Sequence, residues 1–307
     1  MKTPVLMAVV ALAGSLTVNA QGPASAARTT KAWNPPRTAD GQPDLQGTWV
    51  NFDSTPFEAP GAPQLPAANP GVSPPSHWGE TSSSTSAAPA RRPSMIVDPP
   101  DGKVPVMRWA EDKRDYDLER LGDSWVHETP WVRCITRGVP GGMFPAGYNN
   151  AYQIVQTPGY VVIRYEMIHE ARVIPLDGRP HVGKNIRQWN GDPRGHWEGN
   201  TLVVETTNFN DRGSIATSAA TGRIRGIPQS EALHVIERFT PVDGNTINYE
   251  VTVDDPKVYT KPWKAAIPLT RDSQYQIYEY ACQEGNYAVP NELSGGRARD
   301  AAERQPH

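Results

Sequence analysis

Several features that would point to a particular function are absent from this sequence. Its histidines show no H-x-H or H-E-x-x-H spacing, and it has no G-x-S-x-G motif, so neither a zinc site nor a nucleophile elbow is indicated. The formal charge of −3 over 307 residues is close to neutral, which gives no reason to expect nucleic acid or an anionic membrane as a partner. We therefore expect no metal and no cofactor.

Cysteine is scarce as well, with only Cys134 and Cys282 in the chain. The N-terminus has the pattern of a secretory signal, because Lys2 precedes an apolar run over residues 5–16 and a small-residue cleavage site. That run is too short to span a membrane, and no later segment approaches the length of a span. We expect residues 1–20 to be removed and the protein to be exported, to the periplasm or the extracellular space. Two cysteines in an exported protein most simply form one disulfide, and two buried thiols are the alternative.

Composition divides the rest of the chain. Residues 21–104 are rich in Pro, Ser and Ala, which is typical of an extended arm and linker. Residues 105–299 are expected to form the folded domain, and residues 300–307 a short tail. The best helical pattern covers residues 105–128, and most of the domain after residue 128 alternates between apolar and polar residues as strands do.

Strand-like runs in this domain succeed one another through tight turns. The sequence VDGNT between two alternating runs is a strong hairpin signal, and no helical pattern separates successive hairpins. This order predicts an all-β antiparallel meander that forms either a barrel, calycin- or lipocalin-like, or a sandwich. A Pro-rich N-terminal arm and few short helices would complete it.

Several blocks of the sequence carry a resemblance. They are DGQPDLQGTW, IPLDGRPH, GHWEGNTLVVETTNFND, EALHVIERF, VTVDDPKVYTKPW and YACQEGNY. With these blocks the chain resembles an uncharacterised family of exported, β-rich proteins from environmental bacteria, over most of residues 33–299. The resemblance implies an exported β-rich fold and brings no activity with it. Members often carry a His-rich turn before EAL, where this chain has GRIRGIPQ.

The block GHWEGNTLVVETTNFND sets a histidine, a tryptophan and a glutamate side by side. The Gly199-Asn200 pair fits a two-residue hairpin turn. Because side chains alternate along a strand, Trp197 then lies on the apolar face while His196 and Glu198 lie on the other. We predict a surface hairpin here rather than a catalytic cluster.

The same alternation selects polar residues on apolar faces as candidate catalytic residues. His169 falls on an otherwise apolar face if residues 160–175 form one strand, and Glu237 is the odd polar residue on its face. An imidazole in such a place suits proton transfer near neutral pH. We predict His169 as acid or base and Glu237 as its partner. The alternatives are a core histidine bonded to a backbone carbonyl, and an ion pair of Glu237 with Arg172 or Arg238.

Further residues would contact the ligand. Arg172 or Arg238 would stabilise developing negative charge, although Arg172 and Glu166 on one strand face also fit a structural charge ladder. Aromatic side chains, which are usually part of a core, also stack on sugars and aromatic ligands. The predicted ligand-binding residues are Tyr165, Glu166, Trp189, Asn208 and Tyr249.

These residues predict an exported, cofactor-independent acid–base enzyme, namely a hydrolase, lyase or isomerase. Its substrate would be a small molecule or a glycan, either a carbohydrate or a plant-derived phenolic. The alternative is a non-catalytic, lipocalin-like binding protein for a small amphipathic molecule, because DLQGTW is similar over three residues to the Gly-x-Trp entry of lipocalins. A third hypothesis is a structural protein whose Pro-rich arm engages a partner.

Overall fold

The computed structural model describes residues 33–51, 55–59, 92–146, 148–215 and 224–304. The chain divides into two compact units, Met1–Trp33 and Asn34–His307, and the described helices and strands lie in the second. The predicted signal peptide, residues 1–20, lies outside the described residues, as do residues 60–91 of the predicted arm.

In the residues that the structure describes, the second unit consists of strands with two α-helices and three short 3₁₀ helices, labelled η. In chain order they are β1 (Gly47–Val50), β2 (Ile96–Asp98), α1 (Arg108–Glu119), η2 (Trp125–His127), η3 (Gly141–Met143), β3 (Ala151–Thr157), β4 (Tyr160–Tyr165), η4 (Met167–His169), β5 (Ala171–Pro175), β6 (Asp192–Glu198), β7 (Thr201–Thr207), β8 (Ser214–Ile215), β9 (Ile227–Pro228), β10 (His234–Asp243), β11 (Thr246–Asp254), β12 (Trp263–Arg271) and α2 (Ala288–Glu303).

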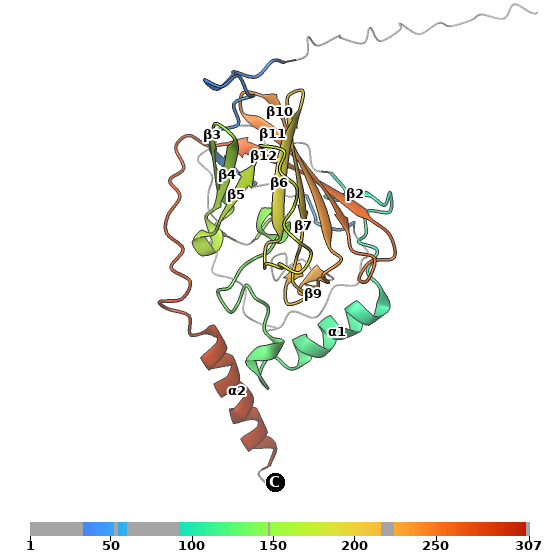
Figure 1. The fold of residues 1–307 in the computed structure, drawn as a ribbon. Helices are drawn as coiled ribbons and strands as arrows, with labels where there is room; N and C mark the ends of the chain where they lie inside the picture. Colours follow the sequence, from blue (N-terminus) through green and yellow to red (C-terminus); the bar gives the residue numbers. More distant parts are fainter. Residues whose placement is uncertain (1–32, 52–54, 60–91, 147, 216–223, 305–307) are drawn as a thin grey trace, which may run out of the picture. The chain divides into compact units, whose positions relative to one another are not determined.

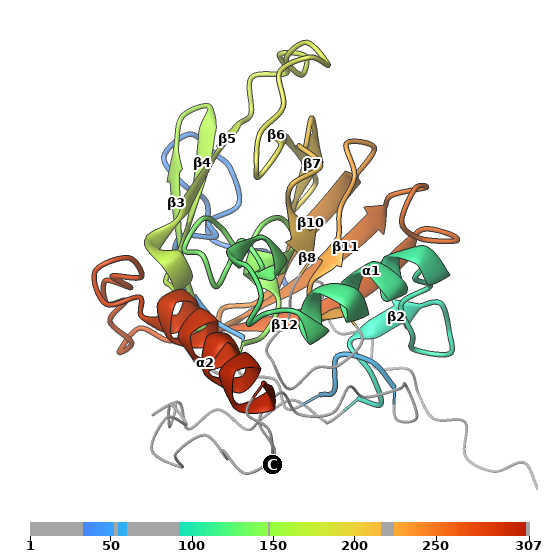
Figure 2. The ribbon, with the colours of Figure 1, turned by 90° about the horizontal axis from the view of Figure 1, so that it is seen from below.

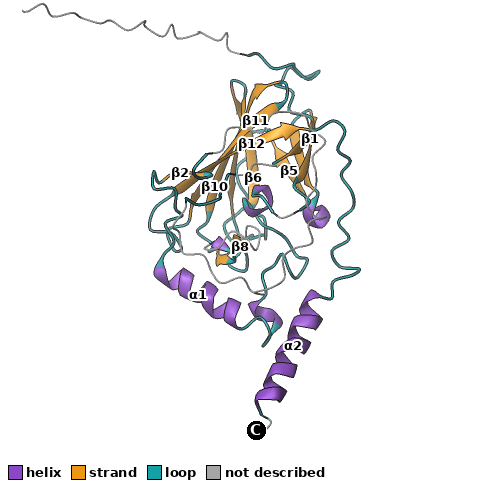
Figure 3. Cartoon of the chain, turned by 180° about the vertical axis from the view of Figure 1, so that it is seen from behind, coloured by secondary structure: helices purple, strands orange, loops and turns teal. Residues whose placement is uncertain are grey.

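Nine strands form one antiparallel sheet in the order β5-β4-β3-β1-β12-β11-β10-β7-β6, and β2 pairs with β12. The sheet curls into a nearly closed barrel in which the two edge strands, β5 and β6, lie next to each other (Figure 1). The prediction of an antiparallel all-β barrel is therefore confirmed, and the barrel replaces the sandwich alternative. Both α-helices lie beyond the same end of the sheet (Figure 3).

The predicted domain boundary at residue 105 is too late. Strand β1 lies between β3 and β12, with Trp49 opposite Tyr152 on the inner face. Leu45 and Trp49 are fully buried, and the Trp49 Nε1–H donates to the Leu45 carbonyl at 2.8 Å. The first core strand is therefore contributed by the segment whose composition suggested an arm.

Closure of the barrel depends on a position without a side chain. A Cβ placed on Gly195 of β6 would lie 2.6 Å from Leu176 Cδ2 and 2.8 Å from Ile174 Cγ2 across the seam. We expect Gly195→Ala to destabilise the protein by about 1–3 kcal/mol, because an added methyl overpacks a closed interior. Chemical denaturation would measure this. Gly244→Ala is the matched control, since nothing lies within 4 Å of that Cβ, and an equal loss in both variants would contradict the role of Gly195.

The hairpin of β6 and β7 has the predicted register. Trp197 pairs with Leu202, and Glu198 pairs with Thr201 across the Gly199-Asn200 turn. Trp197 packs against the core, whereas His196 is exposed and its Nε2 lies 3.2 Å from Glu198 Oε1. The prediction of a surface hairpin at this block is confirmed.

Residues 160–175 do not form one strand. Strand β4 ends at Tyr165, and β5 begins only at Ala171. The turn between them contains Ile168 and His169 with positive φ values of 61° and 42°. Because this turn shifts the alternation, Val173 is exposed and its neighbour Arg172 points into the barrel.

The glycines in residues 137–150 predict a flexible loop over a barrel mouth. The structure differs from this prediction. Residues 137–144 are all buried, and Figure 2 shows this green segment inside the ring of strands. Gly142 lies against Tyr165, whose ring would be 3.2 Å from an added Cβ. The segment fills the barrel interior instead of covering it.

The C-terminal part is attached by the predicted disulfide. Cys134 and Cys282 are bonded, which confirms the pairing. The alternation in SQYQIYEYAC predicts a strand over residues 273–282, but these residues form none. Helix α2 follows at a place where no helix was predicted. Within the described ranges, no helix is long and apolar enough to cross a membrane.

Candidate functional site

Four of the predicted site residues meet inside the barrel. Arg172 of β5 donates from Nη1 to Glu237 Oε1 at 3.0 Å and from Nη2 to Glu237 Oε2 at 2.5 Å. Arg172 Nη1 also donates to the Tyr165 hydroxyl at 2.9 Å, and the Tyr249 hydroxyl donates to Glu237 Oε1 at 3.0 Å. The four residues meet although the alternation over residues 160–175 placed Arg172 on the other strand face, with Glu166.

This cluster has the character of a structural ion pair. The side chains of Arg172 and Glu237 are only 3% and 0% exposed. Burial alone would lower the pKa of Arg172, but the Glu237 carboxylate and the Tyr165 hydroxyl raise it above its ordinary value. Burial raises the pKa values of Tyr165 and Tyr249 as well. The ion pair of Glu237 with Arg172 is thus the alternative that the structure contains.

His169 lies elsewhere, so its predicted place on an inner strand face is wrong. It is exposed in the turn after β4, and its Nδ1 lies 2.7 Å from the carbonyl oxygen of Tyr280. Arg238 points outward from β10 and pairs with Glu198 at 2.7 Å. The physical reason is the turn at residues 166–170, which separates His169 from the face that carries Glu237.

Two of the other predicted ligand residues, Glu166 and Asn208, have structural partners. Glu166 is fully buried and accepts hydrogen bonds of 3.0 and 2.9 Å from the Tyr275 hydroxyl, which hold the C-terminal segment against the barrel. Asn208, with a positive φ of 60°, donates to the carbonyl of Ile186 at 3.0 Å and so fixes the preceding loop. Trp189 is half-buried in that loop. None of these three joins the Arg172–Glu237 cluster in the described structure.

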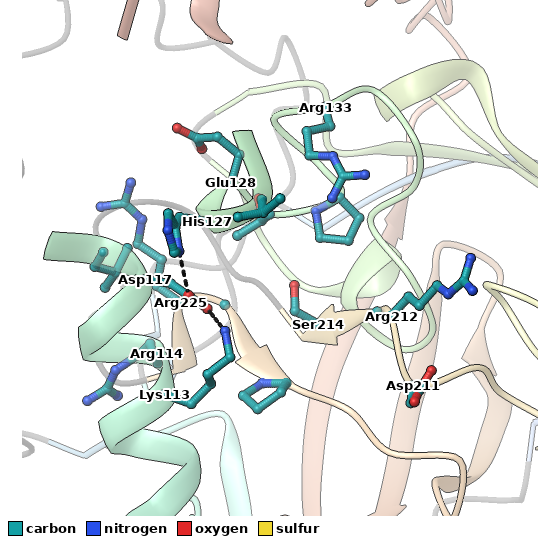
Figure 4. A pocket seen from close by; sticks show the side chains of 17 residues that line it. Lys113, Arg114, Asp117, His127, Glu128, Arg133, Asp211, Arg212, Ser214 and Arg225 are labelled. Carbon is teal, nitrogen blue, oxygen red and sulfur yellow. Dashed lines mark hydrogen bonds and ion pairs between the residues drawn. The ribbon is translucent and has the colours of Figure 1, made fainter. Parts of the chain in front are cut away.

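A pocket of about 170 Å³ lies at the end of the barrel beside α1 (Figure 4). Three separate parts of the chain form it: α1, the segment that continues from η2, and the two short strands β8 and β9. Its charged and hydroxyl-bearing residues include Lys113, Arg114, Asp117, His127, Glu128, Arg133, Asp211, Arg212, Ser214 and Arg225.

Three hydrogen-bonded side chains, His127, Asp117 and Lys113, lie along one wall of this pocket. The Asp117 carboxylate lies between the His127 ring and the Lys113 ammonium (Figure 4). His127 Nδ1 is 2.9 Å from Asp117 Oδ1, and Lys113 donates to Asp117 Oδ2. Because a carboxylate only accepts hydrogen bonds, Nδ1 carries the proton and Nε2 of the neutral ring is the basic nitrogen. An aspartate in this place fixes the tautomer and orientation of the imidazole.

Positive charge exceeds negative charge around the pocket. Five cationic side chains line it, and Arg133 lies 4.8 Å over the ring of Trp125. Glu128 adds little negative charge near neutral pH, because burial and the neighbouring Glu292 raise its pKa to about 8. Figure 4 shows its carboxyl group pointing away from the Asp117–His127 pair. The Ser214 hydroxyl is buried without a hydrogen-bond partner among the described residues.

Sequence reasoning missed this site for a physical reason. His127 closes the predicted helical window, but Asp117 is ten residues earlier, across the end of the helix, where helical periodicity no longer relates two side chains. Ser214 and Arg225 come from a distant segment that only the tertiary fold brings to α1. A usable signal was the pair of arginines in GRIRGIPQ, because Arg225 is one of them.

The described residues contain no group of three or more His, Cys, Asp or Glu side chains placed to hold a metal ion. The groups that the pocket offers are an aspartate-paired imidazole and several cations. No protein-family model, no curated protein and no solved structure matches this chain.

Proposed function

We propose that this pocket binds a small carboxylate-bearing molecule, a sugar acid or a phenolic acid, and that the protein is an exported acid–base enzyme acting on it. The observation that carries the proposal is the Asp117–His127 pair in a pocket whose cations outnumber its carboxylates. Export is supported by the N-terminal signal pattern and by the disulfide, which persists in oxidising compartments.

The chemistry derives from the groups in the pocket. His127, held by Asp117, accepts a proton at Nε2 from the carbon next to the substrate carboxylate, or from a water molecule. Removal of a proton from that carbon creates negative charge on the carboxylate oxygens, and the nearby arginines stabilise it. This arrangement serves isomerisation and β-elimination, and water activation by the same imidazole would serve hydrolysis.

The alternative is a binding protein without turnover. The filled barrel leaves no interior site for its ligand, because residues 137–144 occupy the interior in which a lipocalin-like protein would hold it. A carrier of this fold would then use the same pocket beside α1. The two proposals share the ligand and differ only in the role of His127.

Galacturonate and galactose form a matched pair of probes, since they differ in one carboxylate. In titration calorimetry we expect galacturonate to bind and galactose not to bind. The variant Arg133→Gln should raise the dissociation constant for galacturonate at least about tenfold, because a charge-assisted hydrogen bond is lost.

A second experiment tests the role of His127. The rate at which the hydrogen next to the carboxylate exchanges in D₂O, measured by NMR, should fall about 10²–10⁴-fold in His127→Gln.

His169→Gln is the matched control, because that histidine is exposed and distant in sequence from the pocket residues. It should leave affinity and exchange within about twofold of the wild type. Equal binding of galactose, or unchanged binding in Arg133→Gln, would contradict the site. Binding without exchange would favour the carrier.

A further inference from the structure

Two exposed apolar side chains lie at the edge of the pocket beside α1. Trp125 and Val126 of η2 are 51% and 54% exposed, and Val126 lines the pocket. Single exposed apolar residues are common on soluble proteins, whereas neighbouring ones at the edge of a pocket mark a surface that binds a ligand. Because Val126 belongs both to the pocket wall and to the outer surface, the pocket opens to solvent next to Trp125.

The geometry of η2 places Trp125 beside the pocket. Hydrogen bonds from the His127 amide to the Ser124 carbonyl and from the Glu128 amide to the Trp125 carbonyl, both 3.2 Å long, close the turn. Successive side chains of a 3₁₀ helix point about 120° apart. Val126 and His127 line the pocket, so the side chain of Trp125, in the third direction, lies beyond its edge.

Arg133 connects the Trp125 ring with the pocket. Its side chain lines the pocket (Figure 4), and its guanidinium carbon lies 4.8 Å from the centre of the Trp125 ring. The guanidinium covers one face of this ring, as in a cation–π contact. Since Trp125 is half exposed all the same, its other face is open to solvent. No carboxylate of the described residues forms an ion pair with Arg133, so its charge is available to a ligand.

The size of the pocket limits what it holds. Its volume of about 170 Å³ is close to that of a cavity that holds one benzene-sized ring, about 150 Å³. One sugar acid fills such a space, and a longer ligand has to continue over the edge at Val126. The surface there offers an aromatic ring, on which the apolar face of a sugar stacks, and a cation that binds its carboxylate.

We propose that the protein binds an acidic oligosaccharide, with one sugar acid in the pocket and the next one stacked on the open face of Trp125, its carboxylate on Arg133. The inference rests on the ligand class proposed for the pocket and extends it from a single acid to a chain of acids. Charge selects this ligand over a neutral glycan, because cations outnumber carboxylates around the pocket. A phenolic acid with one ring would fill the pocket and leave Trp125 without a role.

Titration calorimetry with galacturonate and trigalacturonate, on the intact and oxidised protein, tests this inference. We expect the dissociation constant of the trimer to be at least about tenfold below that of the monomer, because stacking and a second charge-assisted contact are added. Trp125→Ala should reduce this ratio to less than about twofold, whereas Trp125→Phe, which keeps an aromatic ring, should retain most of it. The melting temperature of each variant shows that it is folded.

Two controls separate the Trp125 ring and the carboxylates from general effects. Tyr278→Ala removes a ring that is 67% exposed in the segment after β12 and should leave the ratio within about twofold of the wild type. The trimethyl ester of trigalacturonate should bind at least about tenfold more weakly than the acid, since its carboxylates are blocked.

The outcomes distinguish this inference from the function on which it rests. A monomer that binds as tightly as the trimer would overturn the inference and leave the proposed function in place. A ratio that is unchanged in Trp125→Ala would also overturn it, because the added sugars would then lie elsewhere. If neither the monomer nor the trimer binds, the proposed function fails together with the inference.

Discussion

Glu237→Ala should lower the free energy of unfolding by about 3–5 kcal/mol, because it leaves the buried guanidinium of Arg172 without its counter-charge. Arg172 and Glu237 are 3% and 0% exposed, and two hydrogen bonds join them. The Tyr249 hydroxyl would lose its acceptor as well. Denaturation in urea, with the midpoint and the slope both fitted, measures the loss.

The neighbouring residue supplies the control. Arg238→Ala removes a charge from the outer face of the same strand, where its partner Glu198 is 49% exposed, and should cost no more than about 1 kcal/mol. The double variant Arg172→Met/Glu237→Leu should recover most of the loss, since an apolar pair of similar volume often replaces a buried ion pair without penalty. A loss below about 1 kcal/mol in Glu237→Ala would show that Arg172 finds another partner.

Removing the disulfide should have an effect of similar size. Cys134 and Cys282 are 148 residues apart, so their bond closes a loop that contains every strand from β3 to β12. In the chain-entropy description, opening such a loop costs about 5 kcal/mol through the greater freedom of the unfolded chain. The double variant Cys134→Ser/Cys282→Ser should show this loss in chemical denaturation.

Reduction of the wild-type protein provides an independent measurement. Dithiothreitol should lower the stability of the wild type to that of the double serine variant and leave the variant unchanged. Both forms should keep the far-UV spectrum of a β protein in the absence of denaturant, since the barrel strands pair without the disulfide. If reduction costs less than about 1 kcal/mol, the unfolded chain is already compact around these residues.

Local patterns in the sequence were sufficient for much of the fold. The hairpin register of β6 and β7 results from the Gly199-Asn200 turn, and the inward position of Glu237 results from the alternation along β10. The disulfide was predicted from the number of cysteines and the expected compartment. These features depend on neighbours in the chain or on composition, so no tertiary information was needed.

The positions of the candidate site residues depended on tertiary structure and not on local sequence patterns alone. The turn at residues 166–170 moved His169 to the surface and Arg172 to the interior, because two residues with positive φ break the alternation of a strand. The segment 137–144 entered the barrel instead of covering it, because its buried residues complete the packing of the interior.

By itself the sequence determined the alternating strands, their turns, the pairing of the two cysteines and the all-β class. Tertiary structure alone decided that β1 joins the barrel, that Gly195 lets the barrel close, and that α1 meets residues 211–214 and 225–228 to form the pocket. The physical reason is the distance along the chain over which each effect acts. Turn chemistry and strand periodicity act between near neighbours, whereas the pocket depends on side chains about a hundred residues apart, brought together only when the whole sheet packs.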